Sequence, residues 1–259
     1  IRAVKAIAPD LPQVAAFDTA FHRTIPDVTR RFAIPERLHA AGLERYGFHG
    51  LSYQSATEVL GAGRPGGPRR LVVLHLGSGA SAAAILDGAS RATSMGFSAL
   101  DGLVMATRPG ELDPGAILHL IEAHGYDAKG LVKLFYKESG LLGLSGESED
   151  MRVLLASPRP EAKLAIAVYV ERAARTVASL AVTLGGLDMI AFTGGVGENS
   201  PPIRAAILYQ LAFLGVAVDT AKNEMNAARF DADASRIALA MVPAEEERVI
   251  AAATVGLIT

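Results

Sequence analysis

Two glycine-rich segments directly follow apolar runs and could bind phosphate. Gly77-Ser78-Gly79 follows LVVLHL, and GGVGEN (residues 194–199) follows LDMIAFT. Glycine lets a ligand approach the backbone closely, and successive backbone N–H groups in such turns bind anions. Neither segment is a Walker A loop or a GxGxxG turn, so each one alone is better explained as an ordinary tight turn. Two such segments at the ends of two predicted strands make a nucleotide site as good an explanation as ordinary turns.

An arginine and a histidine lie in polar, glycine-marked segments. Arg108 precedes a Pro-Gly pair, and a guanidinium fixed in such a loop matches the oxygens of a phosphoryl group. His49 precedes a glycine and could donate to an oxyanion. A surface arginine and a buried structural histidine are the alternative interpretations. The apolar surroundings of His22 and His75 favour buried structural histidines there.

Acidic residues occupy positions that suit either chemistry or helix capping. Asp18 follows the apolar run QVAAF and could orient a nucleophile or hold a metal-bound water. Asp150 and Arg152 lie at a predicted helix start, and Glu246 belongs to the acidic run of residues 245–247. Carboxylates at helix starts also cap backbone N–H groups and interact favourably with the helix dipole. The residue types alone leave both interpretations open.

Strand and helix patterns alternate along the chain. Apolar runs predict strands at residues 13–17, 71–76, 81–86, 187–192, 216–218 and 237–242. Helical spacing predicts helices at residues 52–60, 115–123, 128–136, 160–184, 203–211 and 245–255. The turn at residues 77–79 predicts a hairpin. Strands alternating with helices predict an α/β domain with a mixed sheet flanked by helices.

The composition narrows the class of protein. The 259 residues are 50% hydrophobic and 20% charged, which is enough apolar material for a sizeable core. A formal net charge of −2 argues against nucleic acid as the main partner. The absence of cysteine excludes disulfides, thiolate metal sites and a cysteine nucleophile. No apolar run reaches about 18 residues and no signal peptide is apparent, so we expect a cytoplasmic protein without a membrane span.

Seven motifs in a fixed order resemble those of the acetate kinase family. The motifs run from Phe17 to Glu247, so the resemblance extends over nearly the whole chain. In chain order they are FDTAFHRTIP, RYGFHGLS, HLGSGAS, TSMGFSALDGLVMATRPGELDPG, SGLLGLSGESEDMR, FTGGVGENS and PAEEE.

The resemblance implies an actin-like, ribonuclease H-like ATPase fold with two related α/β domains. Residues 1–21 would be the end of a first domain that is mostly missing, because family members carry about a further third of the chain before Ile1. Residues 22–243 would form the second, nucleotide-binding domain. Residues 244–259 would form a C-terminal helix that returns to the first domain. Family resemblance also implies a homodimer.

The resemblance further implies Mg²⁺-dependent transfer of a phosphoryl group from ATP to acetate, giving acetyl phosphate and ADP. Asp18, His49 and Arg108 match the family's catalytic residues, Phe48 and Ala99 lie where its acyl pocket is expected, and Glu246 matches a residue linked to Mg²⁺ or alternatively Mn²⁺. The positions that match nucleotide contacts are His75, Leu76, Gly77, Ser78, Gly79, Asp150, Met151, Arg152, Gly195, Val196, Gly197, Glu198 and Asn199.

Two alternatives accompany this interpretation. Ala99 stands where the family usually has proline, and a smaller side chain there would suit propionate or another short-chain acid. A truncated nucleotide-binding chain without turnover is the second alternative. A dehydrogenase is disfavoured because no GxGxxG turn is followed by an acidic residue about 20 positions later.

Overall fold

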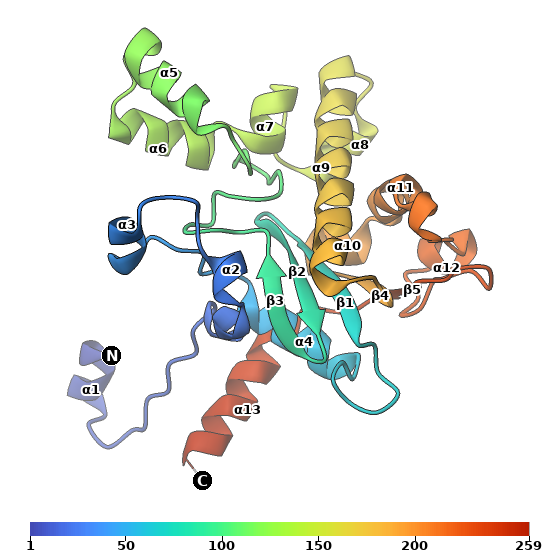
Figure 1. Ribbon diagram of the computed structural model, residues 1–259, viewed down its shortest axis with the longest axis horizontal. Coiled ribbons are helices and arrows are strands. Elements are labelled where there is room, and N and C mark those ends of the chain that lie inside the picture. Colours follow the sequence, from blue (N-terminus) through green and yellow to red (C-terminus); the bar gives the residue numbers. More distant parts are fainter. Residues whose placement is uncertain (259) are drawn as a thin grey trace.

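The computed structural model describes residues 1–258 and centres on a five-stranded sheet of order β3-β2-β1-β4-β5 (Figure 1). β2 runs antiparallel to β1 and β3, whereas β4 runs parallel to β1 and β5. The predicted hairpin and the predicted mixed sheet are therefore confirmed. The strands are β1 (Arg70–Leu76), β2 (Ala80–Leu86), β3 (Ala89–Thr93), β4 (Met189–Thr193) and β5 (Ala238–Met241).

Helices surround the sheet and fill the connections between its strands. Before β1 lie α1 (Arg2–Ile7), η1 (Ala20–Thr24), α2 (Asp27–Arg30), α3 (Glu36–Ala40) and α4 (Gly50–Val59). Between β3 and β4 lie α5 (Pro114–His124), α6 (Ala128–Lys137), α7 (Gly140–Ser145), α8 (Met151–Ala156) and α9 (Pro160–Leu184). After β4 lie α10 (Gly194–Asn199), α11 (Pro201–Gln210), η2 (Ala212–Leu214), α12 (Thr220–Glu224) and α13 (Glu246–Ile258).

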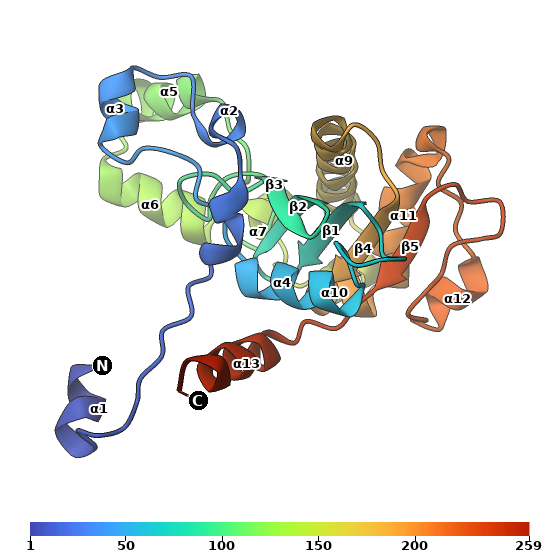
Figure 2. The same ribbon diagram turned by 60° about the horizontal axis from the view of Figure 1, so that its bottom comes forward.

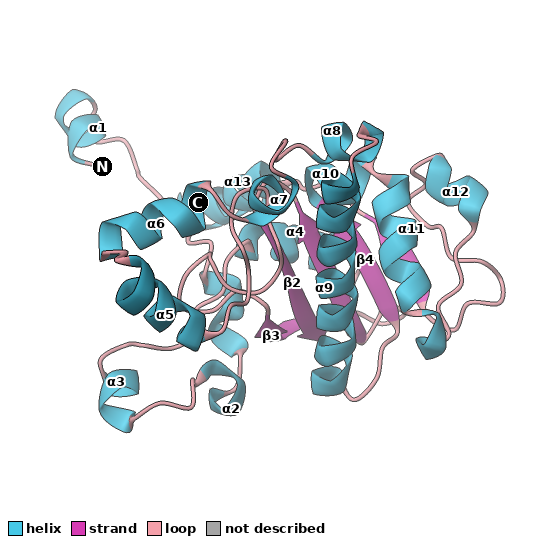
Figure 3. Cartoon of the chain, turned by 90° about the horizontal axis from the view of Figure 1, so that it is seen from above, coloured by secondary structure: helices cyan, strands magenta, loops and turns pink. Residues whose placement is uncertain are grey.

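The two faces of the sheet belong to two separate hydrophobic cores. In β1, Val72 and Leu74 pack into the core that contains α9, while Leu71 and Val73 pack into the core that contains Tyr53 of α4. This division follows from the two-residue period of side chains along a strand. Figure 3 shows α9 lying across one face, and Figure 2 shows α4 and α13 on the opposite side.

The long helix α9 matches its predicted limits. Pro160 occupies its first turn, and Gly185 ends it with a positive φ of 66°. Its buried face includes Ala165, Ala173 and Ala174, whose small side chains let the helix approach the sheet closely. Within residues 1–258, no helix combines the length and hydropathy that are needed to cross a membrane.

The predicted strand at residues 13–17 is wrong. The structure shows an extended segment without a strand partner, and the side chain of Phe17 is 68% exposed. An apolar run forms a strand only where a neighbouring strand shares its backbone hydrogen bonds, and the five-stranded sheet does not include residues 13–17. Figure 2 shows this segment leading from α1 to the body of the molecule.

Three further local predictions need correction. Residues 216–218 form no strand, because only Val218 makes an isolated bridge, to Asp231. β3 was not predicted, since ASRAT contains no apolar run. The segment GGVGEN is not an open turn before a later helix but is itself the helix α10. Here packing against β1 and β4 outweighs the poor helix propensity of glycine.

Candidate active site

The turn between β1 and β2 lies at the centre of the candidate site. The N–H of Gly77 donates to the carbonyl of Gly79 over 3.0 Å, and Ser78 is exposed. A Cβ atom at Gly79 would lie 3.3 Å from Nε2 of His49 and 3.4 Å from Nη2 of Arg108. Because glycine has no Cβ, the point between the imidazole and the guanidinium stays open. Two predicted catalytic side chains therefore converge beside this turn.

Serine and tyrosine hydroxyls hold His49 and its neighbour His75. His49 precedes α4 in a left-handed conformation with φ of 58°, and its Nδ1 lies 2.8 Å from Oγ of Ser81. Oγ of Ser81 also hydrogen-bonds to the hydroxyl of Tyr53. Nδ1 of His75 lies 2.8 Å from Oγ of Ser52. The two imidazoles stack with their centroids 4.1 Å apart and 20° between their planes.

Burial keeps both stacked histidines neutral. Burial, together with the charges of Arg108 and His22, lowers the pKa of His49 to about 4. Burial and the neighbouring His49 lower the pKa of His75 to about 3, against the opposing effect of Asp18. At pH 7 each ring therefore carries one N–H donor and one acceptor nitrogen.

Arg108 lies in a loop whose backbone is fixed. Its Nη1 donates to the carbonyl of Ala99 over 2.9 Å, and its own carbonyl accepts from the N–H of Met105 over 3.0 Å. The N–H of Ser139 donates to the carbonyl of Thr107 over 3.1 Å, which ties the loop to the segment before α7. These contacts restrict the positions that the guanidinium can reach.

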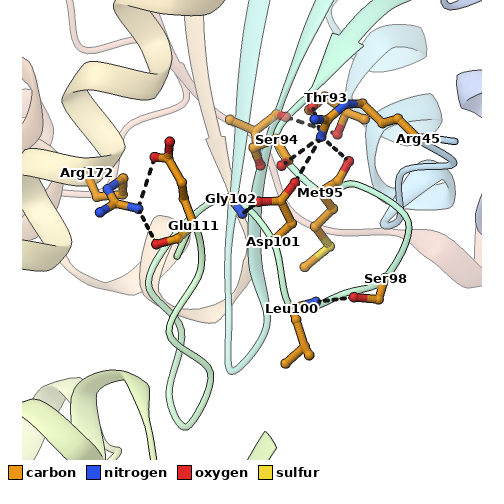
Figure 4. A network of polar contacts seen from close by, with 11 residues as sticks. Arg45, Thr93, Ser94, Met95, Ser98, Leu100, Asp101, Gly102, Glu111 and Arg172 are labelled. Carbon is orange, nitrogen blue, oxygen red and sulfur yellow. Dashed lines mark hydrogen bonds and ion pairs between the residues drawn. The ribbon is translucent and has the colours of Figure 1, made fainter. Parts of the chain in front are cut away.

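The segments on both sides of Arg108 are anchored to the body of the molecule (Figure 4). Before Arg108, Nη1 of Arg45 donates to the carbonyls of residues 93, 94 and 95 and pairs with Asp101 over 3.3 Å. After it, Glu111 pairs with Arg172 of α9 over 3.2 Å. Contacts on both sides of Arg108 therefore hold the loop that places its guanidinium near Gly79.

Asp18 closes the N-terminus of α4. One carboxylate oxygen accepts from the N–H of His49 over 2.6 Å, and the other accepts from the N–H of Leu51 over 3.4 Å. A Cβ at Gly50 would lie 2.0 Å from the carbonyl oxygen of Asp18, so this approach requires glycine. Asp18 thus makes the capping contacts that the sequence left open, and it also fixes the backbone of His49.

Glu246, at the start of α13, lies near Asp18. Burial raises its pKa, and the negative charges of Asp18 and Glu247 raise it further. Within residues 1–258, no group of three or more histidine, aspartate or glutamate side chains could enclose a metal ion. Two neighbouring carboxylates nevertheless suit Mg²⁺, which usually keeps several water ligands and needs few from the protein.

A cavity of about 780 Å³ opens beside the Gly77–Gly79 turn. This volume lies in the range of small-molecule sites in proteins. The cavity reaches from the turn across α8 and α9 to α10 and α11. The lining residues are Gly77, Ser78, Ala106, Leu141, Glu149, Asp150, Met151, Arg152, Leu155, Tyr169, Gly195, Val196, Asn199, Ser200 and Pro202.

Asp150 and Arg152 form an exposed pair at one wall of this cavity. The Asp150 carboxylate caps α8 by accepting from the N–H of Arg152 over 2.9 Å. The same carboxylate pairs with the Arg152 guanidinium over 2.5 Å. Hydrogen bonds from the Arg152 side chain and backbone lower the pKa of Asp150 to about 2. Asp150 therefore caps α8 and, with Arg152, also lines the cavity, so the two interpretations that the sequence left open are compatible with each other.

α10 forms the opposite wall and is held from behind by a buried arginine. The guanidinium of Arg204 is fully buried and donates to the carbonyls of Gly197 and Glu198 over 2.8 and 2.9 Å. It also donates to both the side chain and the carbonyl of Asn223 over 2.8 Å. Arg204 therefore fixes the backbone of the glycine-rich segment without reaching the cavity.

The structure brings most of the predicted residues together, but not all of them. Leu76 and Gly197 are buried beneath the site. Oε1 of Glu198 accepts from the N–H groups of Gly194 and Ala244, over 2.9 and 3.0 Å, so this carboxylate joins α10 to the segment before α13. Phe48 and Ala99 are half-buried and pack against the core that contains α9.

Several residues of the site were missed by sequence reasoning. Tyr53, Ser52 and Ser81 bond to the two histidines, and Tyr169 and Ser200 reach the cavity from α9 and from the residue before α11. The motif HLGSGAS contains Ser81, and strand alternation after the turn could have marked it as facing the histidines. The positions of the others depend on contacts between elements distant in sequence.

Comparison with known proteins identifies the family of the chain. The family model described as the acetokinase family matches residues 1–252. The acetate kinase of Rhodopseudomonas palustris is 48% identical over 255 residues, covering 97% of this chain and 64% of the relative. The chain therefore spans somewhat less than two thirds of that relative's length.

Solved structures show the same fold. The acetate kinase of Porphyromonas gingivalis superposes with a TM-score of 0.92 at 35% identity, covering 100% of this chain and 67% of the other. A propionate kinase from Francisella tularensis superposes with a TM-score of 0.91 at 38% identity, covering 96% and 66%. The expected actin-like α/β fold is confirmed by this agreement, and the chain belongs to the acetokinase family.

Proposed function

We propose that this chain carries the nucleotide-binding and phosphoryl-transfer residues of an acetate kinase. The reaction is reversible transfer of the γ-phosphoryl group of ATP to acetate, with acetyl phosphate and ADP as products. The observation that supports it is the convergence of His49 and Arg108 beside Gly79, at the edge of a cavity of about 780 Å³.

The cavity suits a nucleotide whose phosphates point to the turn. Gly77 and Ser78 of the turn line one side of the cavity, and Asp150, Arg152, Gly195 and Asn199 line its more distant walls. In this placement the base and ribose occupy the region between α8 and α10. The phosphate chain then extends toward the space beside Gly79, where the two donors converge.

The converging donors match the needs of direct in-line transfer. The transferred group spreads negative charge over three equatorial oxygens, so the protein mainly positions the reactants and stabilises charge. The guanidinium of Arg108 offers two donors in a fixed plane, and neutral His49 offers one. Acetate is already ionised near pH 7 and needs no strong base to act as nucleophile.

Asp18 and Glu246 are the residues that we assign to Mg²⁺. The ion supplies charge neutralisation along the nucleotide phosphates, and the two carboxylates would hold it mainly through water. Asp18 has a second task, because it fixes the backbone N–H of His49. Near-wild-type turnover in an Asp18→Asn variant would contradict a role for its charge.

Phe48 and Ala99 are proposed to border the acyl pocket. The carbonyl of Ala99 accepts from Arg108, so the pocket wall adjoins the transfer site directly. The small side chain of Ala99 supports propionate as a second substrate. The Francisella tularensis neighbour is described as a propionate kinase, which is compatible with this second candidate.

Hydroxylamine trapping tests the proposal, because hydroxylamine converts an acyl phosphate to a hydroxamate. The chain is incubated with ATP, Mg²⁺ and acetate, with the Arg108→Ala variant in parallel. Hydroxamate that disappears in the variant would support an acyl kinase. ATP binding without hydroxamate would instead favour a nucleotide-binding chain that does not turn over. The homodimer remains a prediction from family resemblance, and the cytoplasmic location remains a prediction from the sequence.

A further inference from the structure

Three polar groups form a row that ends at the candidate site. The hydroxyl of Tyr53 bonds to Oγ of Ser81, and Oγ of Ser81 lies 2.8 Å from Nδ1 of His49. Tyr53 and Ser81 are fully buried. The opposite nitrogen of the imidazole, Nε2, lies on the side of Gly79 and Arg108. The row therefore joins the interior of the protein to the point where the donors converge.

Two arrangements of protons in which each group donates to the next along the row are compatible with these distances. In the first, Tyr53 donates to Ser81, Ser81 donates to Nδ1 of His49, and Nε2 carries the ring proton. In the second, Nδ1 carries the proton and donates to Ser81, which donates to Tyr53. The two arrangements differ in what His49 presents beside Gly79. The first offers a donor there, and the second offers an acceptor.

Burial of Tyr53 makes the first arrangement more favourable than the second. In the second, the hydroxyl hydrogen of Tyr53 would need another acceptor, and none lies within hydrogen-bonding distance among residues 1–258 apart from Ser81. The backbone N–H of His75 also faces the phenolic oxygen, and it is a further donor rather than an acceptor. A buried donor without an acceptor destabilises a protein by about 1–3 kcal/mol. A third arrangement, in which Ser81 accepts from both Tyr53 and Nδ1, leaves the hydroxyl hydrogen of Ser81 without an acceptor in the same way. In the first arrangement both hydroxyl hydrogens have acceptors, and the Nε2 hydrogen faces the open point beside Gly79.

We propose that Tyr53 and Ser81 are positioning residues that hold His49 as the neutral tautomer protonated at Nε2. The ring then presents an N–H donor beside Arg108, as stabilisation of a phosphoryl group requires. This step rests on the proposed function for its catalytic meaning, whereas the tautomer itself is a property of the folded chain.

The stacked neighbour supplies a matched control. Nδ1 of His75 lies 2.8 Å from Oγ of Ser52, so a different serine bonds to each ring. A Ser52→Ala variant removes the partner of His75 and leaves the row of Tyr53, Ser81 and His49 intact. A Ser81→Ala variant removes the partner of His49 and leaves Ser52 with His75.

Nitrogen NMR of histidine-labelled chain tests the tautomer directly. The protonated and unprotonated ring nitrogens resonate in well-separated regions, and a His49→Gln sample assigns the signals. We expect His49 in wild type to be protonated at Nε2, and we expect Ser81→Ala to convert it to a mixture. Ser52→Ala should leave the signals of His49 in place, and Ser81→Thr should restore them. Protonation of His49 at Nδ1 in the wild type would overturn the proposal, whatever the activity.

Kinetics then test the catalytic consequence. If the chain forms acyl phosphate, we expect Ser81→Ala to lower kcat by about tenfold and Tyr53→Phe by about threefold, with KM for ATP nearly unchanged. A change in KM alone would overturn the positioning role. If no acyl phosphate forms in wild type while the tautomer is as expected, the proposed function fails and the assignment of the row stands.

Discussion

The two ends of the candidate site are built differently. At the histidine end, formed by His49, His75 and Arg108, serine hydroxyls and a loop carbonyl hold the side chains, and both histidines are half-buried. At the nucleotide end, formed by Asp150 and Arg152, the side chains are held mainly by each other, and that of Arg152 is 90% exposed. The side chains at the histidine end are therefore held in place by the protein, whereas those at the nucleotide end are free to rearrange, as the proposed function expects of a transfer site and a nucleotide-binding site.

Removing one arginine from each end tests this comparison most strongly. We expect Arg108→Ala to lower kcat by about 10³-fold, as for arginines that stabilise phosphoryl transfer. We expect Arg152→Ala to raise KM for ATP by less than about tenfold with little change in kcat, since an exposed group contributes modestly. Steady-state rates with varied ATP measure both values. Equal losses of kcat in the two variants would contradict the division.

Arg204 is buried behind α10 at the nucleotide end, and its replacement should lower the stability of the fold. Arg204→Met removes hydrogen bonds to Asn223 and to the α10 carbonyls and leaves these groups unpaired. We expect the free energy of unfolding to fall by on the order of 3 kcal/mol, measured by urea denaturation. Arg175→Met, at an exposed pair with Glu171, serves as control and should change it by less than about 0.5 kcal/mol. Similar losses in both variants would contradict the role of Arg204.

The buried histidines predict a stability that depends on pH. The unfolded chain binds a proton at each histidine near pH 6.5, whereas folded His49 and His75 bind one only near pH 4 and 3. Unfolding therefore takes up protons between these values, and their contribution is complete above pH 6.5 and is lost as the pH falls. Each histidine contributes a slope of about 1.4 kcal/mol per pH unit in that window.

Thermal unfolding between pH 7.5 and 4.5 measures this dependence. We expect His75→Gln to reduce the slope, and His119→Gln, at an exposed position on α5, to leave it unchanged. A transition temperature that stays constant from pH 6.5 to 5 would contradict the neutral, buried state of the two rings.

The smallest expected effect is the difference in rate between acetate and propionate as substrates. Ala99 leaves room beside the transfer site, and one methylene changes binding by about 1–3 kcal/mol at most. We expect the rate with propionate to lie within about tenfold of the rate with acetate, measured by hydroxamate formation. An Ala99→Pro variant should favour acetate more strongly. A propionate rate a hundredfold lower in the unchanged chain would contradict an open pocket.

Local pattern was sufficient to predict the elements with strong periodicity. The apolar run of β1, the turn after it and the spacing along α9 all predicted structure that is present. Residues 13–17 have an equally apolar run and form no strand, because strand formation depends on a partner that the run itself does not specify. The helix α10 was not predicted, because its glycines have low helix propensity and its helical conformation depends on packing against the sheet.

The candidate site was predictable where one short motif contains both the backbone turn and the side chain. His49, Arg108 and the Gly77–Gly79 turn each lie in such a motif. The roles of Arg204 and Tyr53 could not be predicted, because their hydrogen-bond partners are distant in sequence. No local sequence pattern distinguishes a buried guanidinium or hydroxyl that holds the site from an exposed one. Glu198 shows the converse, since a motif residue bonds to the backbone instead of lining the cavity.

The position of Glu246 beside Asp18 has a consequence for synthesis of the chain. The two carboxylates are separated by more than two hundred residues, yet the charge of Asp18 raises the pKa of Glu246. Translation proceeds from the N-terminus, so residues 22–243 can begin to fold on the ribosome before Glu246 has emerged. The cavity and the stacked histidines can therefore form early, while the carboxylate pair is completed last. The proposed nucleotide site would therefore be complete in a nascent chain before the proposed metal site.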